Sequence, residues 1–359
     1  MYKDPKARDI GTEWFKCHLG VKQGDVISPT LFAIYIDDLV SELRELGVGI
    51  KIGDDIINSL LYADDIVLIA ANEDDLQLLL KKLNSWCSKW RLEVNMLKTN
   101  VMHVRKAQAK RSDYSFLFEG RRVEYCERYK YLGITINEHL NFTQSVQDLC
   151  ASAERALSGI ISKMIKNKGF PFNVYHTLYE ACVCSVADYA SEVLGFHEQA
   201  AVEKLHNRAI RAFLGLDKRT AVSGMRAEMN WIEPRSRRQI RMVRMYHRLV
   251  CMPDGRLTKK VFLWDRSLSE NLYCQTWCGE VKSIMSRNNL IEIFNTNIFN
   301  LKATIVKLKQ SLAIKDKVKL KNMCLTLPKL RTYNLIADFD SPKVYLTKPL
   351  TFSQRRSLA

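Results

Sequence analysis

Residues 59–70 read SLLYADDIVLIA, two apolar runs separated by an acidic pair, Asp64 and Asp65. β-Branched and aromatic residues on both sides of a polar dipeptide predict a β-hairpin. Burying two adjacent carboxylates without a cation costs several kcal/mol, so something should compensate them. Two interpretations stay open on these residues alone. Both carboxylates face solvent and serve the turn, or they hold Mg²⁺ at the hairpin tip for phosphoryl transfer.

The flanking segments predict helices on both sides of this hairpin. Residues 24–47 place apolar residues at helical spacing, with Ser28 as the expected N-cap, Pro29 at the first helical position and Gly47 as the expected C-cap. Residues 73–91 carry leucines and tryptophans on one helical stripe. Short strands are expected within residues 50–52, 92–104 and 116–136. The first third of the chain is therefore expected to be mixed α and β.

From residue 140 onward the pattern becomes helical. Apolar residues recur at spacings of three and four through residues 145–166, 173–195 and 200–216, and Met252 to Gly255 end another helix. Near the C-terminal end, lysines alternate with other residues at Lys315, Lys317, Lys319 and Lys321. That alternation is typical of a flexible charged segment.

The charge is distributed unevenly. The 359 residues hold 55 Lys and Arg against 39 Asp and Glu, a formal net charge of +16. Residues 1–100 hold 12 basic against 16 acidic residues, a net charge of −4, whereas residues 101–359 hold 43 against 23, a net charge of +20. This asymmetry indicates a polyanion as partner of the later part, with nucleic acid favoured over an anionic membrane surface.

Composition excludes several classes of protein. Hydrophobic residues make up 47% of the chain, enough to build cores, which argues against wholesale disorder. The ten cysteines lack the paired CxxC spacing of a zinc site and indicate buried thiols in a reducing compartment. No apolar stretch reaches the 18 residues of a membrane span, and Met1 to Glu13 carry charges where a signal peptide is apolar. We expect a soluble, intracellular protein that is not secreted.

Four blocks in order resemble the reverse transcriptases of non-LTR (LINE-type) retrotransposons. GVKQGDVISPTLFAIYIDDL, residues 20–39, resembles motif B of their palm, and YADD, residues 62–65, resembles motif C. LEVNMLKT, residues 92–99, is similar to motif D, and YKYLGI, residues 129–134, is similar to motif E, the primer grip. Later, LHNRAIR at residues 205–211 and the arginine-rich residues 235–248 resemble the thumb and post-thumb segment.

The resemblance implies roles for individual residues. Asp64 and Asp65 would be Mg²⁺ ligands of nucleotidyl transfer, and Lys98 would approach the departing pyrophosphate, although a surface lysine at a strand end is an equal alternative. Gln23 and Gly24 would lie near the nucleotide, and the structural alternative for Gly24 is a loop glycine before a capped helix. Tyr131, Leu132 and Gly133 would lie against the primer, and their alternative is an ordinary aromatic turn.

A row of arginines indicates nucleic-acid contact. Arg237, Arg241, Arg244 and Arg248 recur at spacings of four, three and four, so they share one face of a helix, which we call the arginine face. Apolar residues occupy another face, so the helix can dock on a core while its guanidinium groups meet a phosphate backbone. The alternative is a solvated charged face.

The chain also departs from the family pattern. The polymerases hold their metals with a further carboxylate from motif A, upstream of motif B, but only 19 residues precede Gly20. Asp4 and Asp9 lie in a polar segment without a surrounding apolar strand and are not accepted as substitutes. Loss of one metal carboxylate lowers the rate by orders of magnitude, so this chain alone is expected not to polymerise. The family's endonuclease domain and C-terminal Cys/His knuckle are also missing, which suggests a fragment.

We therefore expect an α+β fold in three parts. Residues 1–136 would form a partial right-hand reverse transcriptase palm, residues 137–225 a helical thumb, and residues 226–359 a basic, mostly helical C-terminal region. The first hypothesis is a fragment of an RNA-directed DNA polymerase whose intact relatives use Mg²⁺, deoxynucleoside triphosphates, an RNA template and a DNA primer in nucleus and cytoplasm. The alternative is a non-catalytic nucleic-acid-binding remnant, whose binding would survive loss of Asp64 and Asp65.

Overall fold

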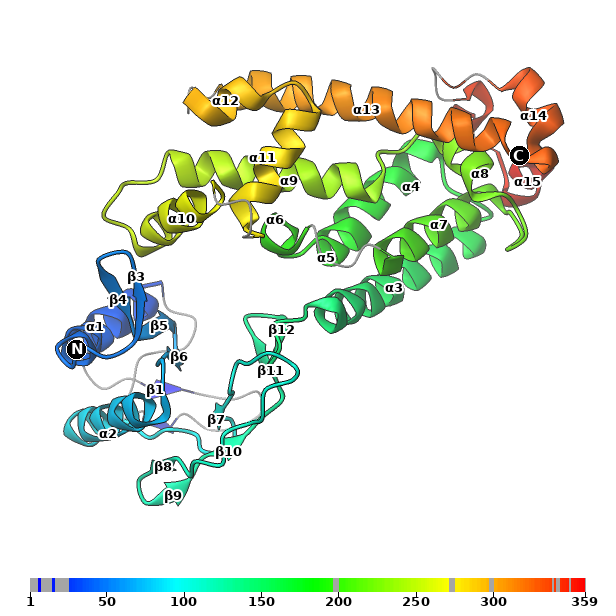
Figure 1. Ribbon diagram of the computed structural model, residues 1–359. Coiled ribbons are helices and arrows are strands. Elements are labelled where there is room, and N and C mark those ends of the chain that lie inside the picture. Colours follow the sequence, from blue (N-terminus) through cyan, green and yellow to red (C-terminus); the bar gives the residue numbers. More distant parts are fainter. Residues whose placement is uncertain are drawn as a thin grey trace. The chain divides into compact units, whose positions relative to one another are not determined.

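The computed structural model describes residues 6–7, 15–16, 26–195, 200–270, 275–296, 300–337, 339, 343–348 and 350–358. The chain divides into two compact units, Met1–Glu127 and Arg128–Ala359, called here the N-terminal unit and the C-terminal unit (Figure 1). Among the described helices, none has the length and apolar character needed to cross a bilayer. Helices and small sheets occur together, which confirms the expected mixed α+β class.

The N-terminal unit combines two long helices with short strands. The described strands pair two by two, with β7 and β10 parallel and the other pairs antiparallel. In chain order the elements are β1 (Lys6–Ala7), β2 (Phe15–Lys16), α1 (Ser28–Arg44), β3 (Ile50–Ile52), β4 (Asp55–Ile57), β5 (Ser59–Tyr62), β6 (Asp65–Leu68), α2 (Glu73–Trp90), β7 (Asn100–Val101), β8 (Leu117–Phe118), β9 (Arg121–Arg122) and β10 (Glu124–Tyr125).

Helix α1 begins differently from the prediction. Ile27 already has helical dihedral angles and makes no side-chain capping bond, and its carbonyl oxygen accepts from the amide of Leu31 at 3.0 Å. Ser28 therefore lies inside the helix, so the prediction that it is the N-cap is wrong. At the other end the helix stops at Arg44 and its C-cap is Glu45, so the predicted C-cap Gly47 lies two residues too late; Gly47 has φ +66°, a conformation that glycine adopts without strain.

The core of the N-terminal unit lies between α1 and α2. Helix α2 is capped by Asn72, whose side-chain oxygen accepts from the amide of Asp75 at 2.9 Å. Its predicted apolar stripe is buried, with Leu79, Leu83 and Trp86 at 6% exposure or less. These side chains pack in one cluster with residues of α1 and of the short strands. Leu61 of β5 and Ile66 and Leu68 of β6 pack against the same cluster, so the hairpin rests on the two helices.

The C-terminal unit is helical after one hairpin. Its elements are β11 (Arg128–Tyr131), β12 (Ile134–Asn137), α3 (Thr143–Lys166), α4 (Phe172–Leu178), a π-helical segment (Tyr179–Cys184), α5 (Ser185–Ala187), α6 (Ser191–Leu194), α7 (Ala200–Leu214), α8 (Val222–Met229), α9 (Pro234–Val250), α10 (Leu257–Leu268), α11 (Trp277–Arg287), α12 (Ile291–Thr296), α13 (Leu301–Leu325), a 3-10 turn (Pro328–Leu330), α14 (Arg331–Ile336), a second 3-10 turn (Val344–Thr347) and α15 (Phe352–Leu358). The predicted change to helical structure is confirmed. The alternating lysines lie within α13, so the prediction of a flexible segment there is wrong.

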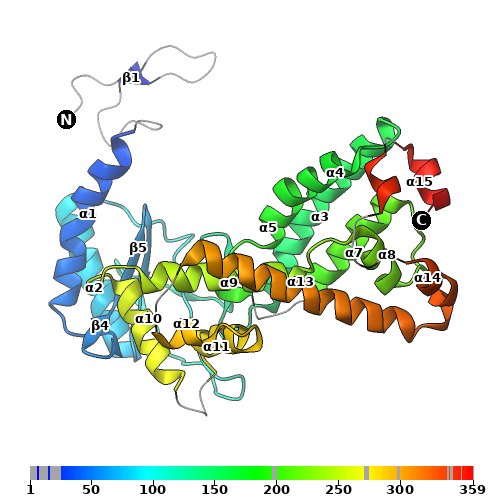
Figure 2. The ribbon, with the colours of Figure 1, turned by 90° about the horizontal axis from the view of Figure 1, so that it is seen from above.

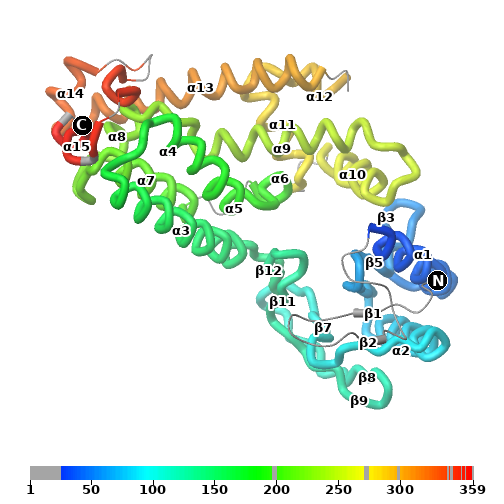
Figure 3. Tube along the Cα trace, turned by 180° about the vertical axis from the view of Figure 1, so that it is seen from behind, coloured from blue at the N-terminus to red at the C-terminus, as the bar shows by residue number. Residues whose placement is uncertain are grey.

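Two apolar clusters organise these helices. The first gathers α3, the π-helical segment, α7 and α8 around Trp231, and α3 and α7 lie side by side (Figure 1, Figure 3). The second joins α9, α10, α11, α12 and α13, with α9 and α13 side by side (Figure 1, Figure 2). Helix α9 contributes Ile240, Val243 and Tyr246 to the second cluster. Its remaining faces carry the arginines discussed below.

Candidate metal-binding turn and nucleic-acid interface

The acidic pair lies at the tip of the predicted hairpin. Strands β5 and β6 are antiparallel, and Tyr62 pairs with Asp65, so Ala63 and Asp64 form a two-residue turn. Ala63 has φ +52°, a left-handed conformation that favours glycine and costs a residue with a Cβ atom about 1–2 kcal/mol. Both Asp64 and Asp65 are exposed. The turn therefore presents two adjacent carboxylates to solvent on a short, strained connection.

Two exposed carboxylates match part of what Mg²⁺ requires. This ion takes oxygen ligands, and protein sites commonly offer it one or two carboxylates while phosphates and waters supply the rest. In the described residues, no group of three or more His, Cys, Asp or Glu side chains is arranged to hold a metal ion. Asp64 and Asp65 can therefore serve as two ligands of a site that needs further oxygen atoms from elsewhere.

Lys98 lies on an exposed turn stabilised by Asn95. The side-chain oxygen of Asn95 accepts from the amide of Leu97 at 3.1 Å. The backbone carbonyl oxygen of Asn95 accepts from the amide of Lys98 at 3.0 Å and from the Thr99 hydroxyl at 2.9 Å. These bonds fix the backbone that carries the lysine. The other residues predicted to lie near the nucleotide, Gln23 and Gly24, are outside the described residues.

The predicted primer turn belongs to the C-terminal unit. Strands β11 and β12 pair Tyr131 with Ile134, which leaves Leu132 and Gly133 as a two-residue turn. Both have positive φ, +47° and +82°, as the commonest two-residue hairpin turn requires. Thr135 in β12 donates two hydrogen bonds to α3, from its amide to the Ser145 hydroxyl at 3.2 Å and from its hydroxyl to Asp148 Oδ2 at 3.1 Å. The turn is thus attached to the helical region that follows it.

A second attachment holds the turn itself. The Tyr189 hydroxyl donates to the carbonyl oxygen of Leu132 at 2.9 Å. A Cβ atom added to Gly133 would lie 3.4 Å from the Tyr189 ring, so the ring lies directly against this glycine. Tyr189 follows α5 and is half exposed. The hydrogen bond and the ring contact together fix the conformation of the turn from the helical side.

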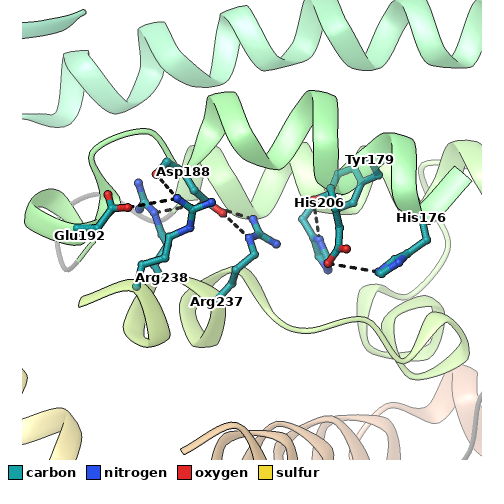
Figure 4. Close-up of polar contacts among 9 residues, drawn as sticks. His176, Tyr179, Asp188, Glu192, His206, Arg237 and Arg238 are labelled. Atoms are coloured by element: carbon teal, nitrogen blue, oxygen red, sulfur yellow. Dashed lines mark hydrogen bonds and ion pairs between the residues drawn. The ribbon is translucent and has the colours of Figure 1, made fainter. Parts of the chain in front are cut away.

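The residue before Tyr189 anchors this contact in the protein interior. Asp188 is completely buried, and Figure 4 shows its carboxylate with Arg237 and Arg238 of α9. Arg237 donates to it through Nε and, at 3.4 Å, through Nη2, while Arg238 Nε lies 3.7 Å from Oδ1. Burial alone would lower the pKa of Arg237, but the Asp188 carboxylate more than reverses this and raises it. Arg237 therefore stays protonated in the fold.

A buried histidine lies in the same interior. His206 Nδ1 is 2.9 Å from the Tyr179 hydroxyl, and both side chains are drawn in Figure 4. Burial, followed by the charges of Arg237 and Arg226, holds the pKa of His206 well below its ordinary value. Burial likewise raises the pKa of Tyr179. Both groups are neutral, so they are part of the core and carry no charge toward a ligand.

The arginine face is divided by these contacts. Arg237 is bound to Asp188, and Arg241 Nη1 lies 3.4 Å from Glu192 Oε1. Arg244 and Arg248 are exposed, and within the described part of the chain no hydrogen bond or ion pair engages either side chain. The expectation of four guanidinium groups facing solvent is therefore corrected for the first two. Two acidic residues distant in sequence compensate them: Asp188, directly after α5, and Glu192 of α6.

The sequence reasoning missed Asp188 and Tyr189. A single Asp-Tyr pair at the end of a helical apolar segment forms no motif. The partner of Asp188, Arg237, is 49 residues away in sequence, and the partner of Tyr189, Leu132, is 57 residues away. The only available signal was an acidic residue inside the apolar pattern of residues 173–195. Burial of that carboxylate required a cation, but the sequence did not say which arginine would supply it.

Comparison with known proteins places this geometry in a family. Residues 5–136 match the family described as reverse transcriptase (RNA-dependent DNA polymerase). The chain is 26% identical over 201 residues to the RNA-directed DNA polymerase from mobile element jockey of Drosophila melanogaster, covering 52% of this chain and 20% of that protein. It is 35% identical over 143 residues to the Pol polyprotein from type-2 retrotransposable element R2DM of the same species, covering 38% and 13%.

A third relative is the Pol polyprotein from type-1 retrotransposable element R2 of Nasonia vitripennis. It is 27% identical over 151 residues, which cover 39% of this chain and 15% of that protein. The chain thus spans a fifth or less of the length of these three relatives. The match includes the hairpin of Asp64 and Asp65 and ends with the strands of the Leu132 turn. Residues 5–136 are therefore a reverse transcriptase region of the kind that non-LTR retrotransposons encode.

Proposed function

We propose that this chain is part of an RNA-directed DNA polymerase: it binds a primer–template hybrid and presents two metal-binding carboxylates, but does not polymerise alone. The observation that carries the proposal is the exposed turn of Asp64 and Asp65 inside the region that matches reverse transcriptases. In this proposal residues 1–136 act as the palm, residues 137–225 as the thumb and residues 226–359 as a basic region that contacts nucleic acid.

The carboxylates of Asp64 and Asp65 would hold a divalent cation, with Mg²⁺ the ion that intact relatives of this family are expected to use. When bound, such an ion neutralises phosphate charge and orients the reacting oxygen atoms. The chain's own groups would position the partners: Lys98 near the departing pyrophosphate, and Gln23 and Gly24 near the incoming nucleotide. The strained backbone at Ala63 supports this role, because strain of this kind is commonly retained at functional turns.

Tyr131, Leu132 and Gly133 would lie against the primer. The support is the attachment of their turn by Tyr189, which fixes the backbone that a primer strand would meet. Of the arginine face, Arg244 and Arg248 remain available for phosphate contacts, whereas Arg237 and Arg241 act within the fold. The partners proposed are an RNA template and a DNA primer.

A non-catalytic nucleic-acid-binding protein is the second candidate. Residues 128–359 hold 37 Lys and Arg against 19 Asp and Glu, a net charge of +18, while residues 1–127 hold 18 against 20, a net charge of −2. The basic excess thus belongs to the C-terminal unit, which does not contain Asp64 and Asp65. Binding and metal chemistry should therefore separate by mutation.

Metal binding gives the sharper test of the first candidate. We expect Mn²⁺, used as a spectroscopic probe for Mg²⁺, to bind the wild-type chain and to bind Asp64→Asn/Asp65→Asn at least tenfold more weakly by electron paramagnetic resonance titration. Asp54→Asn is the matched control, because Asp54 also lies on an exposed hairpin turn of the same unit. Equal Mn²⁺ affinity in all three proteins would contradict the proposed metal turn.

Primer extension by the chain alone tests the remaining prediction from the sequence. We expect no extension of a DNA primer on an RNA template with Mg²⁺ and deoxynucleoside triphosphates. If extension occurs and is lost in Asp64→Asn but kept in Asp54→Asn, the metal turn is catalytic and the predicted inactivity is wrong.

A further inference from the structure

We propose that a cavity at the corner between α9 and α10 is a binding site for the phosphodiester backbone of a nucleic acid. The cavity has a volume of about 470 Å³ and is lined by His247, Arg248, Cys251, Met252, Pro253 and Arg256. We call it the corner cavity. The proposal rests on the nucleic-acid binding proposed above and assigns it to a defined place in the C-terminal unit.

The first argument is the charge of the lining. Two guanidinium groups and an imidazole face the corner cavity, and no carboxylate lines it. Asp254, the nearest acidic residue in sequence, has a side chain 91% exposed and lies 4.0 Å from Lys259. Within the residues that the structure describes, the side chains of Arg248 and Arg256 have no hydrogen-bond or ion-pair partner. An anion that enters the cavity therefore meets two uncompensated arginines.

The second argument is the contrast along α9. Arg244, His247, Arg248 and Cys251 follow each other at spacings of three, one and three and thus share one helix face. Arg237 and Arg241 begin the same row, but Asp188 and Glu192 bind them. The protein therefore neutralises the first half of the row internally and leaves the second half open. A row kept only for solubility needs no such division.

The third argument is that the walls of the corner cavity are fixed before any ligand binds. Lys259 of α10 is buried, and its ammonium group donates to the carbonyls of Leu249 at 3.1 Å and Val250 at 2.7 Å. These bonds satisfy carbonyls at the end of α9 and join α10 to α9 next to the residues that line the cavity. Tyr246 and Phe262 also pack edge to face, with ring centres 5.6 Å apart. Arg248 and Arg256 are thus held on elements that do not have to rearrange.

The chemistry of the lining identifies the ligand. Guanidinium groups bind phosphate oxygen atoms through paired N–H donors. A volume of about 470 Å³ exceeds one phosphate and falls in the range of nucleotide-sized sites. Met252 and Pro253 add apolar surface that a sugar or base can cover. Arg244, one turn before Arg248, extends the positive surface beyond the cavity, which favours a strand over a free nucleotide.

The test compares two pairs of arginines. A labelled RNA/DNA hybrid is titrated with the full chain, with Arg248→Gln/Arg256→Gln, and with the control Arg219→Gln/Arg235→Gln, which removes equal charge from exposed positions of the same unit. By fluorescence anisotropy we expect the cavity variant to bind at least tenfold more weakly and its salt slope to fall by about two, while the control stays within about threefold. Circular dichroism melting checks that the exposed substitutions leave the fold intact.

Several outcomes would overturn the proposal. If both variants weaken equally, only net charge matters and the cavity has no special role. If wild type binds and the cavity variant binds equally well, the hybrid binds elsewhere, while the proposed function stands. If wild type does not bind the hybrid, the proposed nucleic-acid function itself fails. Arginine-dependent binding to inorganic phosphate or to phosphatidylserine vesicles, without binding to the hybrid, would assign the cavity to a free anion or a membrane.

Cysteine labelling provides an independent readout of the same place. Cys251 lines the corner cavity and is exposed, and Cys182 is exposed in the π-helical segment. We expect saturating hybrid to slow alkylation of Cys251 by iodoacetamide at least fivefold and to leave Cys182 unchanged, as followed by peptide mass spectrometry. Equal rates at Cys251 with and without bound hybrid would contradict occupation of the cavity.

Discussion

The Tyr189 hydroxyl donates a hydrogen bond of 2.9 Å to the carbonyl oxygen of Leu132. Leu132 lies in the turn that resembles the primer grip, and Tyr189 lies 57 residues later in the helical part of the same unit. The next residue toward the interior, Asp188, is held by Arg237 of α9. A continuous set of contacts therefore leads from α9 to the turn, and each contact can be tested separately.

Gly133→Ala should destabilise the C-terminal unit. Gly133 has φ +82°, which costs a residue with a Cβ atom about 1–2 kcal/mol, whereas the added methyl group would only make an ordinary contact of 3.4 Å with the Tyr189 ring. Gly159→Ala is the matched control, because Gly159 lies exposed within α3 with open space around it and should gain up to about 1 kcal/mol from helix propensity. Urea unfolding measures both. If the free energy of unfolding changes in the same direction in both variants, the strained turn is contradicted.

Tyr189→Phe isolates the hydrogen bond from the ring contact. Because the bond is half exposed and water can replace the hydroxyl, the free energy of unfolding should fall by only about 0.5–1 kcal/mol. Hybrid binding should be weaker in Tyr189→Ala than in Tyr189→Phe, because the alanine also removes the ring beside Gly133. If Tyr189→Ala binds the hybrid as wild type does, the turn does not contribute to binding.

Asp188→Asn should be among the most damaging single changes in the C-terminal unit. The substitution leaves Arg237 and Arg238 without their buried carboxylate, and breaking a buried pair in this way costs about 3–5 kcal/mol. Glu180→Gln is the control, since that side chain is 55% exposed and lies 3.7 Å from His176, where less than about 0.5 kcal/mol is expected. Chemical denaturation that gives both variants the same midpoint would refute the buried pair.

Stability should also depend on pH through Glu233. Burial raises its pKa from 4.5 to about 7, opposed by Arg226, and Glu203 and Asp316 add to the increase while Lys319 opposes it. Arg226 cannot fully neutralise Glu233, because it also binds Glu203. A carboxyl group whose pKa is higher in the fold stabilises it below pH 4.5, and that contribution is lost as pH rises toward 7.

The measurement is the difference in unfolding free energy between wild type and Glu233→Gln. Between about pH 4.5 and 7 wild type should lose up to about 3 kcal/mol relative to the variant. His206 acts in the opposite direction, since its lowered pKa stabilises the fold above pH 6.5, but it is present in both proteins and cancels. Parallel curves for the two proteins would show that Glu233 does not titrate in this window.

Local patterns in the sequence predicted much of this fold. The hairpin at residues 59–70, helix α2 and the helical region after residue 140 follow from the spacing of apolar residues, which acts over a few neighbours. The start of α1 was missed by one position, because a serine before a proline is an equally good first helical residue. The helical state of the lysines in α13 depends on burial of Leu308 and Leu312 earlier in that helix.

The candidate site could be predicted only in part. Asp64 and Asp65 were found because their chemistry lies in adjacent residues. The division of the arginine face could not be found, because it depends on Asp188 and Glu192, about 50 residues from the arginines they bind. The corner cavity likewise depends on the angle between α9 and α10, which no local pattern encodes. Long-range pairing of charges is therefore what the structure adds.

The most direct test of the account is the binding of a labelled RNA/DNA hybrid by the full chain at increasing KCl concentration. We predict that affinity falls about 30-fold or more between 50 and 200 mM KCl, as three or more phosphate contacts require. We also predict that Asp64→Asn/Asp65→Asn binds within about twofold of wild type, because the basic excess lies in residues 128–359. No binding at 50 mM KCl, or binding that does not change with salt, would contradict the account.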